Sequence, residues 1–481
     1  MAKPLPQPLS SAAMVAADRD WEGAGEGSRV PLASCRHRLP LTLGGPGRQD
    51  ASGTGETGGA DVESLLSRGL RELGAYSLLE ELTSGGHRLS GSAGAANAVA
   101  WGERRMKELG FANVRLVPCK VTHWVRGREE ASMEGALLSI CALGGSVGTP
   151  RGGIEAEVIE VRSLEQCEKL GDRAKGKIIF FNRPMDASLP NTFAAYGGAV
   201  DQRVQGASVA AKVGAVAVLV RSMTLDKDDA PHTGALRYAD GVPQIPAAAL
   251  GWQSADRLAL RIARRGTAKV KLELGCRTYP DAPSASVVGE LVGTEKPNEV
   301  IVVGGHLDSW DLSHGAHDDG SGCVQAMEAL RLLRVCGLRP KRTIRAVLFM
   351  NEENGLRGAL SYAVENRPER HIAGIESDSG GFAPRAFGVG GTKEQVEKVR
   401  AWLPGLSLAG IERIDEGGGG ADVGPLKEKG AVTIGLEPES QRYFDYHHSR
   451  KDTIDKVNPR ELELGAIAMA ILAWRISELG V

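Results

Sequence analysis

Residues 300–311 read VIVVGGHLDSWD, a short apolar run followed at once by two glycines, a histidine and two aspartates. A run such as 300–303 is typical of a strand that is buried on both faces of a sheet. Two later runs, 343–350 and 372–376, are also short and mainly apolar, and acidic residues follow each of them. The sequence therefore predicts three buried strands with polar side chains just beyond their carboxyl ends.

Helical patterns separate and follow these strands. Residues 321–335 place apolar side chains near one face of a helix. Residues 459–478 form a closing helix, which Asn458 is suited to cap and in which Pro459 occupies a favourable first position. Strands that alternate with helices predict an α/β fold with a mainly parallel, mixed sheet flanked by helices.

The rest of the chain is arranged around this sheet. Residues 61–124 carry amphipathic helical patterns and are predicted to form the first part of the main domain, which resumes at 281–481. Between them, residues 125–280 alternate short β-branched runs with glycine-rich turns, which predicts a smaller β-rich insert domain with one or two helices, one of them at 202–213. Residues 1–60 are rich in Gly, Ser, Pro and Ala and predict a disordered or low-complexity segment.

Composition excludes several classes of function. The net charge of −2 over 481 residues gives no electrostatic reason to expect nucleic acid or an anionic membrane as a partner. No apolar run approaches the ~18–20 residues needed to cross a bilayer. The seven cysteines are irregularly spaced and contain no CxxC pair, so we expect neither a disulfide framework nor a thiolate zinc site.

Candidate metal ligands follow each of the three strands. His306 and Asp308 follow the first strand, Glu352 and Glu353 the second, and Asp378 the third. Because ligands in open α/β sheets bind at the carboxyl ends of the strands, these side chains are expected to meet at one edge.

Two further segments add to this set. The turn HDDGSG at 317–322 opens the helix at 321–335, and HHSRKDT at 447–453 precedes the last helix. Zinc takes His nitrogen and carboxylate oxygen, and two ions about 3.5–4 Å apart can share one bridging carboxylate. The pattern predicts a catalytic site for divalent metal ions. His232, in contrast, is a lone loop histidine and is expected to be structural or on the surface.

Several longer strings resemble a known family. They are GGHLDSWD at 304–311, GAHDDGSG at 315–322, LRPKRTIRAVLFMNEENG at 338–355, ESDSGGF at 376–382, GADVGPL at 420–426 and HHSRKDT at 447–453. These motifs resemble the zinc aminopeptidase family of two-metal exopeptidases, and in particular its carboxypeptidase Q subgroup. The similarity runs from about residue 61 to 478, and the insert looks like a protease-associated domain.

The resemblance implies two Zn²⁺ per chain. His306, Asp318 and Asp378 match the ligands of one ion, and Asp318, Glu353 and His448 match those of the other, with Asp318 as the bridge. His448 is preferred to His447 because the family histidine lies four residues before the aspartate of the Asp-Thr pair at 452–453.

Other roles are carried over in the same way. Glu352 matches the general base, and Asp308 matches a carboxylate that orients His306. Asp422 matches a family aspartate to which we assign no role. Members of the family often hold the Asp-Asp peptide in cis, which we expect at Asp318–Asp319.

Substrate and location follow from the resemblance alone. It implies hydrolysis of short peptides, such as dipeptides with free termini, by a homodimer that is extracellular or lysosomal. Residues 1–60 show no signal-peptide pattern, and the chain contains no Asn-x-Ser/Thr sequon.

Three alternatives stay open. A broad-specificity aminopeptidase would accept peptides blocked at the carboxyl terminus. A non-catalytic homologue would have lost a ligand or Glu352, and none is lost here. A glutaminyl-cyclase-like acyltransferase would use a single zinc ion.

Overall fold

A computed structural model of the chain describes residues 57–365 and 367–481. The segment predicted to be disordered, 1–60, lies outside the described residues up to position 56. The first described helix, α2, spans Thr57–Glu72, so regular structure starts slightly before the predicted residue 61.

The main sheet has eight strands in the order β1-β10-β12-β11-β13-β16-β14-β15. Their bounds are Ala112–Val125 (β1), Arg277–Leu291 (β10), Arg342–Phe349 (β12), Lys296–His306 (β11), Arg370–Glu376 (β13), Val432–Pro438 (β16), Pro384–Gly390 (β14) and Arg413–Glu416 (β15). The central strands β12, β11, β13 and β16 are parallel, and so are β14 and β15. The other pairs are antiparallel, so the sheet is mixed with a parallel centre, as the sequence predicts.

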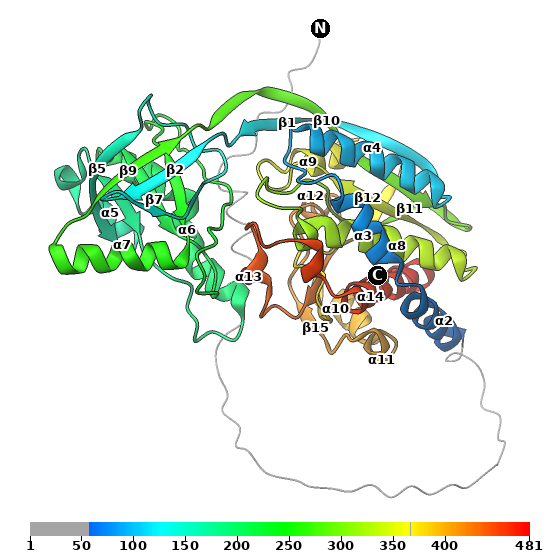
Figure 1. The fold of residues 1–481 in the computed structure, drawn as a ribbon. Helices are drawn as coiled ribbons and strands as arrows, with labels where there is room; N and C mark the ends of the chain where they lie inside the picture. The colour runs from blue at the N-terminus through cyan, green and yellow to red at the C-terminus, as the bar shows by residue number, and fades with distance from the viewer. Residues whose placement is uncertain (1–56, 366) are drawn as a thin grey trace, which may run out of the picture.

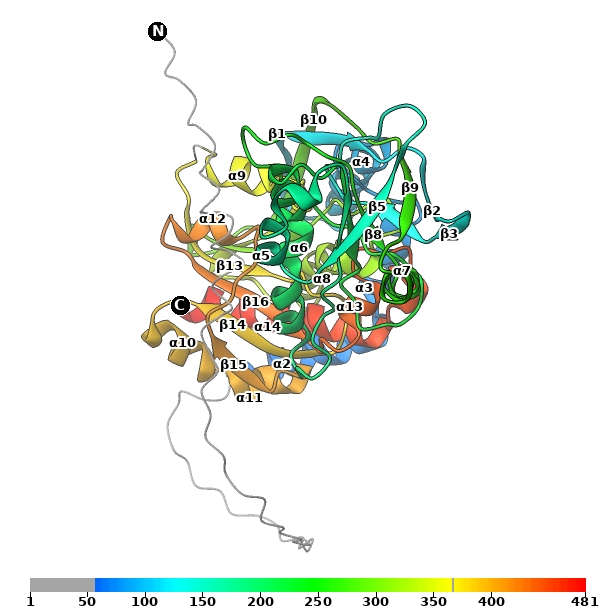
Figure 2. The same ribbon diagram turned by 90° about the vertical axis from the view of Figure 1, so that its left-hand side faces the viewer.

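Alternate side chains of β11 enter two separate cores. Ile301 and Val303 pack on the side of α8 (Ser321–Val335) and α14 (Pro459–Leu479), whereas Val300 and Val302 pack on the side of α9 (Arg357–Ala363). Because helices cover both faces of the sheet (Figures 1 and 2), the strand has no polar face, which explains the uninterrupted apolar run.

Smaller helices complete the two cores. The first core also includes side chains from α2, α3 (Gly74–Thr83), α4 (Ala93–Glu108), α10 (Lys393–Arg400) and α11 (Leu403–Leu406), and the second includes α12 (Gly424–Lys427). The side chain of Asn458 accepts hydrogen bonds from the backbone of Arg460 and Glu461, which confirms the predicted cap of α14.

A second eight-stranded sheet forms between the two halves of the main sheet's sequence. Its order is β3-β2-β9-β5-β6-β7-β8-β4. The bounds are Ala136–Leu138 (β3), Glu129–Met133 (β2), Lys269–Leu274 (β9), Ile154–Val161 (β5), Ile178–Phe181 (β6), Ala217–Arg221 (β7), Ala247–Leu250 (β8) and Ile140–Ala142 (β4). Strands β5 to β8 are parallel.

The insert contains more helix than the sequence predicts. Helix α6 spans Thr192–Lys212, about twice the length of the helix expected at 202–213. The insert also has two further helices, α7 (Trp252–Arg265) and the short α5 (Leu164–Glu168), where the sequence predicts at most one, with no position assigned to it. These helices cover the parallel strands of the second sheet, which would otherwise expose apolar side chains to water.

Two connections join the insert to the main sheet. Strands β1 and β10 pair from Ala112–Glu290 to Val125–Arg277 and form a long ribbon that runs from one sheet to the other (Figure 1). On the opposite side, α6 packs against α13 (Tyr443–Tyr446), where Tyr196 stacks on Phe444 with ring centroids 4.7 Å apart. The insert therefore contacts the segment that leads directly into the two adjacent histidines.

Two findings within the described residues concern the cysteines and membrane-spanning helices. Six cysteines lie there and none forms a disulfide, while Cys35 lies outside them. Across residues 57–365 and 367–481, no helix is both long and apolar enough to cross a membrane.

Candidate metal centre

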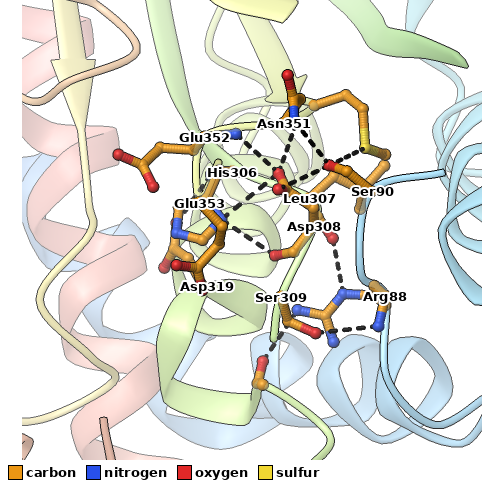
Figure 3. Close-up of polar contacts among 12 residues, drawn as sticks. Arg88, Ser90, His306, Leu307, Asp308, Ser309, Asp319, Asn351, Glu352 and Glu353 are labelled. Carbon is orange, nitrogen blue, oxygen red and sulfur yellow. Dashed lines mark hydrogen bonds and ion pairs between the residues drawn. The ribbon is translucent and has the colours of Figure 1, made fainter. Parts of the chain in front are cut away.

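The parallel strands bring their carboxyl ends together at one edge of the main sheet. His306 is the last residue of β11 and is in register with Phe349, the last residue of β12. The loop after β12 then supplies Glu352 and Glu353, and Asp378 follows β13 two residues after Glu376. Figure 3 shows His306, Glu352 and Glu353 around this edge.

Asp318 lies between two histidine–carboxylate groups. Its Oδ1 is 3.2 Å from Nε2 of His306, and that Nε2 is 3.5 Å from Oδ1 of Asp378. Its Oδ2 is 3.2 Å from Nε2 of His448, and that Nε2 is 3.0 Å from Oε2 of Glu353. The structure therefore brings together all five residues expected as ligands, with Asp318 shared between the groups.

Burial makes this cluster unfavourable without cations. Oδ2 of Asp318 and Oε1 of Glu353 are buried and accept no hydrogen bond. Burial also raises the pKa of Glu353 and of Asp378 above the ordinary carboxyl range. Because uncompensated buried charge is costly and His nitrogen with carboxylate oxygen suits zinc, the residues present fit divalent metal ions.

His447 is a second histidine within reach. Its Nε2 is 3.8 Å from Oδ2 of Asp318, and its ring stacks on that of His448 with centroids 3.5 Å apart. Ligand atoms of Asp318, His447 and His448 lie within 4.8 Å of one another. His448 lies closer to Asp318 and also meets Glu353, which favours it as the ligand.

Asp308 holds the loop that carries Glu352. Its Oδ1 accepts hydrogen bonds from the backbone N–H of Asn351 (2.6 Å) and Glu352 (3.0 Å), and Ser90 donates to Oδ2 (Figure 3). The carboxylate lies 3.8 Å from Nδ1 of His306, whereas the Asp308 carbonyl lies 3.0 Å from it. The main chain of Asp308 is thus the nearer partner of His306. Burial raises the pKa of Glu352 well above the ordinary carboxyl range.

Two buried aspartates, Asp452 and Asp319, fix the turn around Asp318. Asp452 accepts hydrogen bonds from the backbone of His317 (2.7 Å) and Asp318 (3.0 Å), and Asp319 accepts one from the backbone of His306 (2.9 Å). The Asp318–Asp319 peptide is cis, as expected. In the sequence, Asp452 lies four residues after His448, and a carboxylate at such a fixed distance from a candidate ligand is a signal for a supporting residue.

Arg88 is a further residue that sequence analysis missed. Its buried guanidinium donates to the carbonyls of Leu307, His314 and Gly315, so it ties together both ends of the loop after β11. Arg88 lies in the string HRLSGS at 87–92, which the pattern of metal ligands did not include.

The insert also reaches this centre. Nδ1 of His232 lies 2.7 Å from the carbonyl of His447, and His232 is only 2 % exposed. The backbone N–H of Thr233 donates to the carbonyl of His448, and Nδ1 of His448 lies 3.3 Å from the carbonyl of Thr233. His232 is therefore buried and not on the surface, and the insert loop contacts both neighbouring histidines.

Asp422 lies in a second acidic group behind the ligands. Both of its carboxyl oxygens are buried without a hydrogen bond, and burial raises its pKa well above the ordinary range. Burial likewise raises the pKa of Glu376 to about 7, and Glu376 accepts a hydrogen bond from the backbone of Val423. Neither residue contributes to the two histidine–carboxylate groups.

Comparisons with known proteins identify a family and several relatives. The model of peptidase family M28 matches residues 286–473. Carboxypeptidase Q from Mus musculus is 36 % identical over 399 residues, covering 82 % of this chain and 83 % of the mouse protein. Carboxypeptidase Q from Xenopus laevis is 38 % identical over 402 residues, with the same coverage.

Solved structures share the fold. A peptidase M28 precursor from Shewanella amazonensis has a TM-score of 0.84 and 32 % identity, covering 87 % of this chain and 96 % of its own. A zinc aminopeptidase from Bacillus subtilis has a TM-score of 0.62 at 20 % identity, covering 84 % and 94 %, which supports the fold alone.

Proposed function

This chain belongs to peptidase family M28, and from that premise we propose that it is a zinc-dependent exopeptidase that hydrolyses short peptides. The observation that carries the proposal is the placement of Asp318. Each of its carboxyl oxygens faces a different histidine, and each histidine faces a second carboxylate. A short carboxylate between two such groups is the arrangement expected for paired ions.

The proposed ligands follow from the two groups. His306, Asp318 and Asp378 would hold one Zn²⁺, and Asp318, Glu353 and His448 would hold the other. When bound, the ions would polarise the scissile carbonyl and lower the pKa of the attacking water molecule.

Glu352 is the proposed general base. It is carried by the loop after β12, beside Glu353, and Asp308 fixes the backbone at its position. In this role Glu352 takes a proton from the attacking water and later gives it to the leaving amine. Asp308 acts indirectly, by holding Glu352 and the backbone carbonyl that meets His306.

The proposed substrates are dipeptides or other short peptides with free termini. The two carboxypeptidase Q proteins, similar over most of the chain, support a carboxypeptidase or dipeptidase activity. The earlier resemblance also leads us to propose a homodimer acting outside the cytoplasm. Sedimentation equilibrium should then give twice the chain mass of 50.8 kDa.

Metal content and activity, measured together, test the function. We expect about two zinc ions per chain, hydrolysis of a small dipeptide panel, loss of activity with a chelator and recovery on adding zinc. A folded protein that binds no zinc and hydrolyses none of the peptides would instead indicate a binding protein on the same fold.

A further inference from the structure

Five arginines are buried in the described part of the chain, and one of them has no hydrogen-bond or ion-pair partner there. The partnered ones are Arg88 with three backbone carbonyls, Arg126 with Asp311, Arg221 with Asn182 and Asp256, and Arg345 with Glu290 and Glu369. Arg203, on α6 of the insert, is 7 % exposed, and its Nε is buried without an acceptor. Among the described residues, no carboxylate or carbonyl pairs with its guanidinium.

Arg203 lies beside the candidate metal centre. Its Cζ is 5.4 Å from the ring centroid of Tyr196, which itself meets the edge of His447. A Cβ at Gly234 would lie 2.5 Å from Nη1 of Arg203 and 2.7 Å from Nδ1 of His448. The glycine, with φ of +130°, therefore leaves just enough room for the guanidinium to lie next to a proposed zinc ligand.

A buried guanidinium in this position requires an anion. An isolated charge away from water is costly, and the other buried arginines avoid that cost through their partners. Metal cations in the neighbouring centre cannot compensate a further positive charge. The compensating anion must come from a ligand that reaches the remaining exposed part of Arg203.

A short peptide supplies such an anion at its carboxyl terminus. The α-carboxylate is planar and matches the two parallel N–H donors of a guanidinium. One residue spans only about 3.5 Å, so a carboxylate held beside His448 leaves the last peptide bond near the metal ligands. An amidated peptide has the same shape but lacks the charge.

We propose that Arg203 binds the α-carboxylate of the substrate and so selects peptides with a free carboxyl terminus. This inference rests on the proposed exopeptidase function and deepens it. It assigns to the insert the recognition of one peptide end, while the main domain supplies the metal ligands and the base.

Paired substrates test the role of Arg203. The zinc-loaded protein is assayed with a dipeptide and with the amide of the same dipeptide. We expect the free acid to be preferred, and Arg203→Ala to lower kcat/KM for the acid about 100-fold, since truncating one member of a buried charge pair has an effect of that order. The amide should change less than about 3-fold, because it makes no charge pair. For the free acid, kcat/KM of Arg203→Lys should lie between the values of the unsubstituted chain and of Arg203→Ala. Lys212→Ala removes an exposed charge from the same helix and should behave as the unsubstituted chain.

Other outcomes would overturn the inference. If Arg203→Ala slows both substrates equally and loses zinc, Arg203 acts by supporting His448. If the variant keeps the preference for the free acid, its charge does not select the carboxylate. Should the zinc-loaded chain hydrolyse neither substrate, the exopeptidase proposal fails separately. In that case, calorimetry measures the affinity of the dipeptide and of its amide for the unsubstituted chain and for Arg203→Ala. These affinities decide the role of Arg203 without turnover.

Discussion

At the scale of single residues, Asp318 has the most demanding position. Its two carboxyl oxygens lie 3.2 Å from Nε2 of two different histidines, and its backbone is held by Asp452. An asparagine has the same shape but carries no charge and offers one oxygen instead of two.

We therefore predict that Asp318→Asn weakens both metal sites together. The variant is dialysed against a series of zinc concentrations, and the zinc bound per chain is measured. Both ions should be lost over the same range of zinc concentration. Asp378→Asn is the matched control, because it should weaken one site only. A variant at 318 that binds two zinc ions as tightly as the unsubstituted chain would exclude the bridging role.

Glu352 is predicted to act in chemistry and not in metal binding. Glu352→Gln should keep both zinc ions and the unfolding midpoint but lose about 10²–10⁴-fold in kcat, the range for removal of a general base. Turnover and metal content are measured on the same preparation. Near-normal kcat in a fully loaded variant would rule out the assignment.

The residues that could be predicted from the sequence lie near strand ends, whereas those that could not be predicted lie far from them. His306, Glu353 and Asp378 could be predicted because each follows a recognisable strand, and parallel strands end at the same edge. Arg88 and Arg203 could not, because they lie far from the strand ends in sequence. Their roles depend on which loops fold over the centre, which no local pattern encodes.

At the scale of elements, a helix or strand could be predicted where its own sequence pattern is strong, and was missed where packing against a sheet stabilises it. Strand β12 and helix α8 lie within one residue of where their patterns place them, at Arg342–Phe349 and Ser321–Val335. Helix α7 was missed, and α6 was predicted too short. α6 contains Gly197, Gly198 and Gly206, which weaken a helical signal, and it is stabilised by packing on the second sheet.

Helices α8 and α14 meet at a buried carboxyl pair, which gives a prediction about pH. Glu463 on α14 accepts a hydrogen bond from the backbone of Ala75 (3.0 Å). Burial, with the charge of Glu328 on α8, raises the pKa of Glu463 to about 9 from an ordinary 4.5. The folded chain therefore holds a proton that the unfolded chain releases, so this group lowers stability progressively as pH rises from about 4.5 towards 9.

Glu463→Gln should remove that dependence. The variant should be more stable than the unsubstituted chain at pH 8 by more than about 1 kcal/mol, since one pKa unit corresponds to about 1.4 kcal/mol. At pH 4 the two should be nearly equal, because the glutamate is then protonated in both states. Urea denaturation at the two pH values measures the difference in free energy of unfolding between the variant and the unsubstituted chain. If that difference is the same at both pH values, Glu463 is ionised in the folded chain.

At the scale of the whole molecule, the site is built by two sheets. The main sheet and the loops that follow its strands supply the proposed ligands, while the insert supplies His232 and Thr233, whose contacts fix the segment of His447 and His448. Composition and motif order predicted an insert, but its contact with the site depends on the β1–β10 ribbon and on α6, which bring distant segments together.

The ion pair between Arg126 and Asp311 links these two parts of the molecule. Arg126 follows β1 at the start of the insert, and Asp311 lies in the loop after β11 that leads from His306. Nε of Arg126 is 3.0 Å from both carboxyl oxygens, and Arg126 is only 7 % exposed. Glu129 lies 3.6 Å from the same guanidinium and is a weaker second partner.

Asp311→Asn should therefore destabilise the folded chain by about 3 kcal/mol, because it leaves a buried guanidinium without its main partner. It should also lower kcat/KM, since the insert would no longer hold its loop against His448 in one position. Urea denaturation and dipeptide hydrolysis measure the two effects. Glu412→Gln breaks the exposed pair with Arg385 and should change stability by less than about 1 kcal/mol. If Asp311→Asn behaves like that control in both assays, the pair does not couple the insert to the metal centre, and the contacts of α6 with α13 must hold the two parts together.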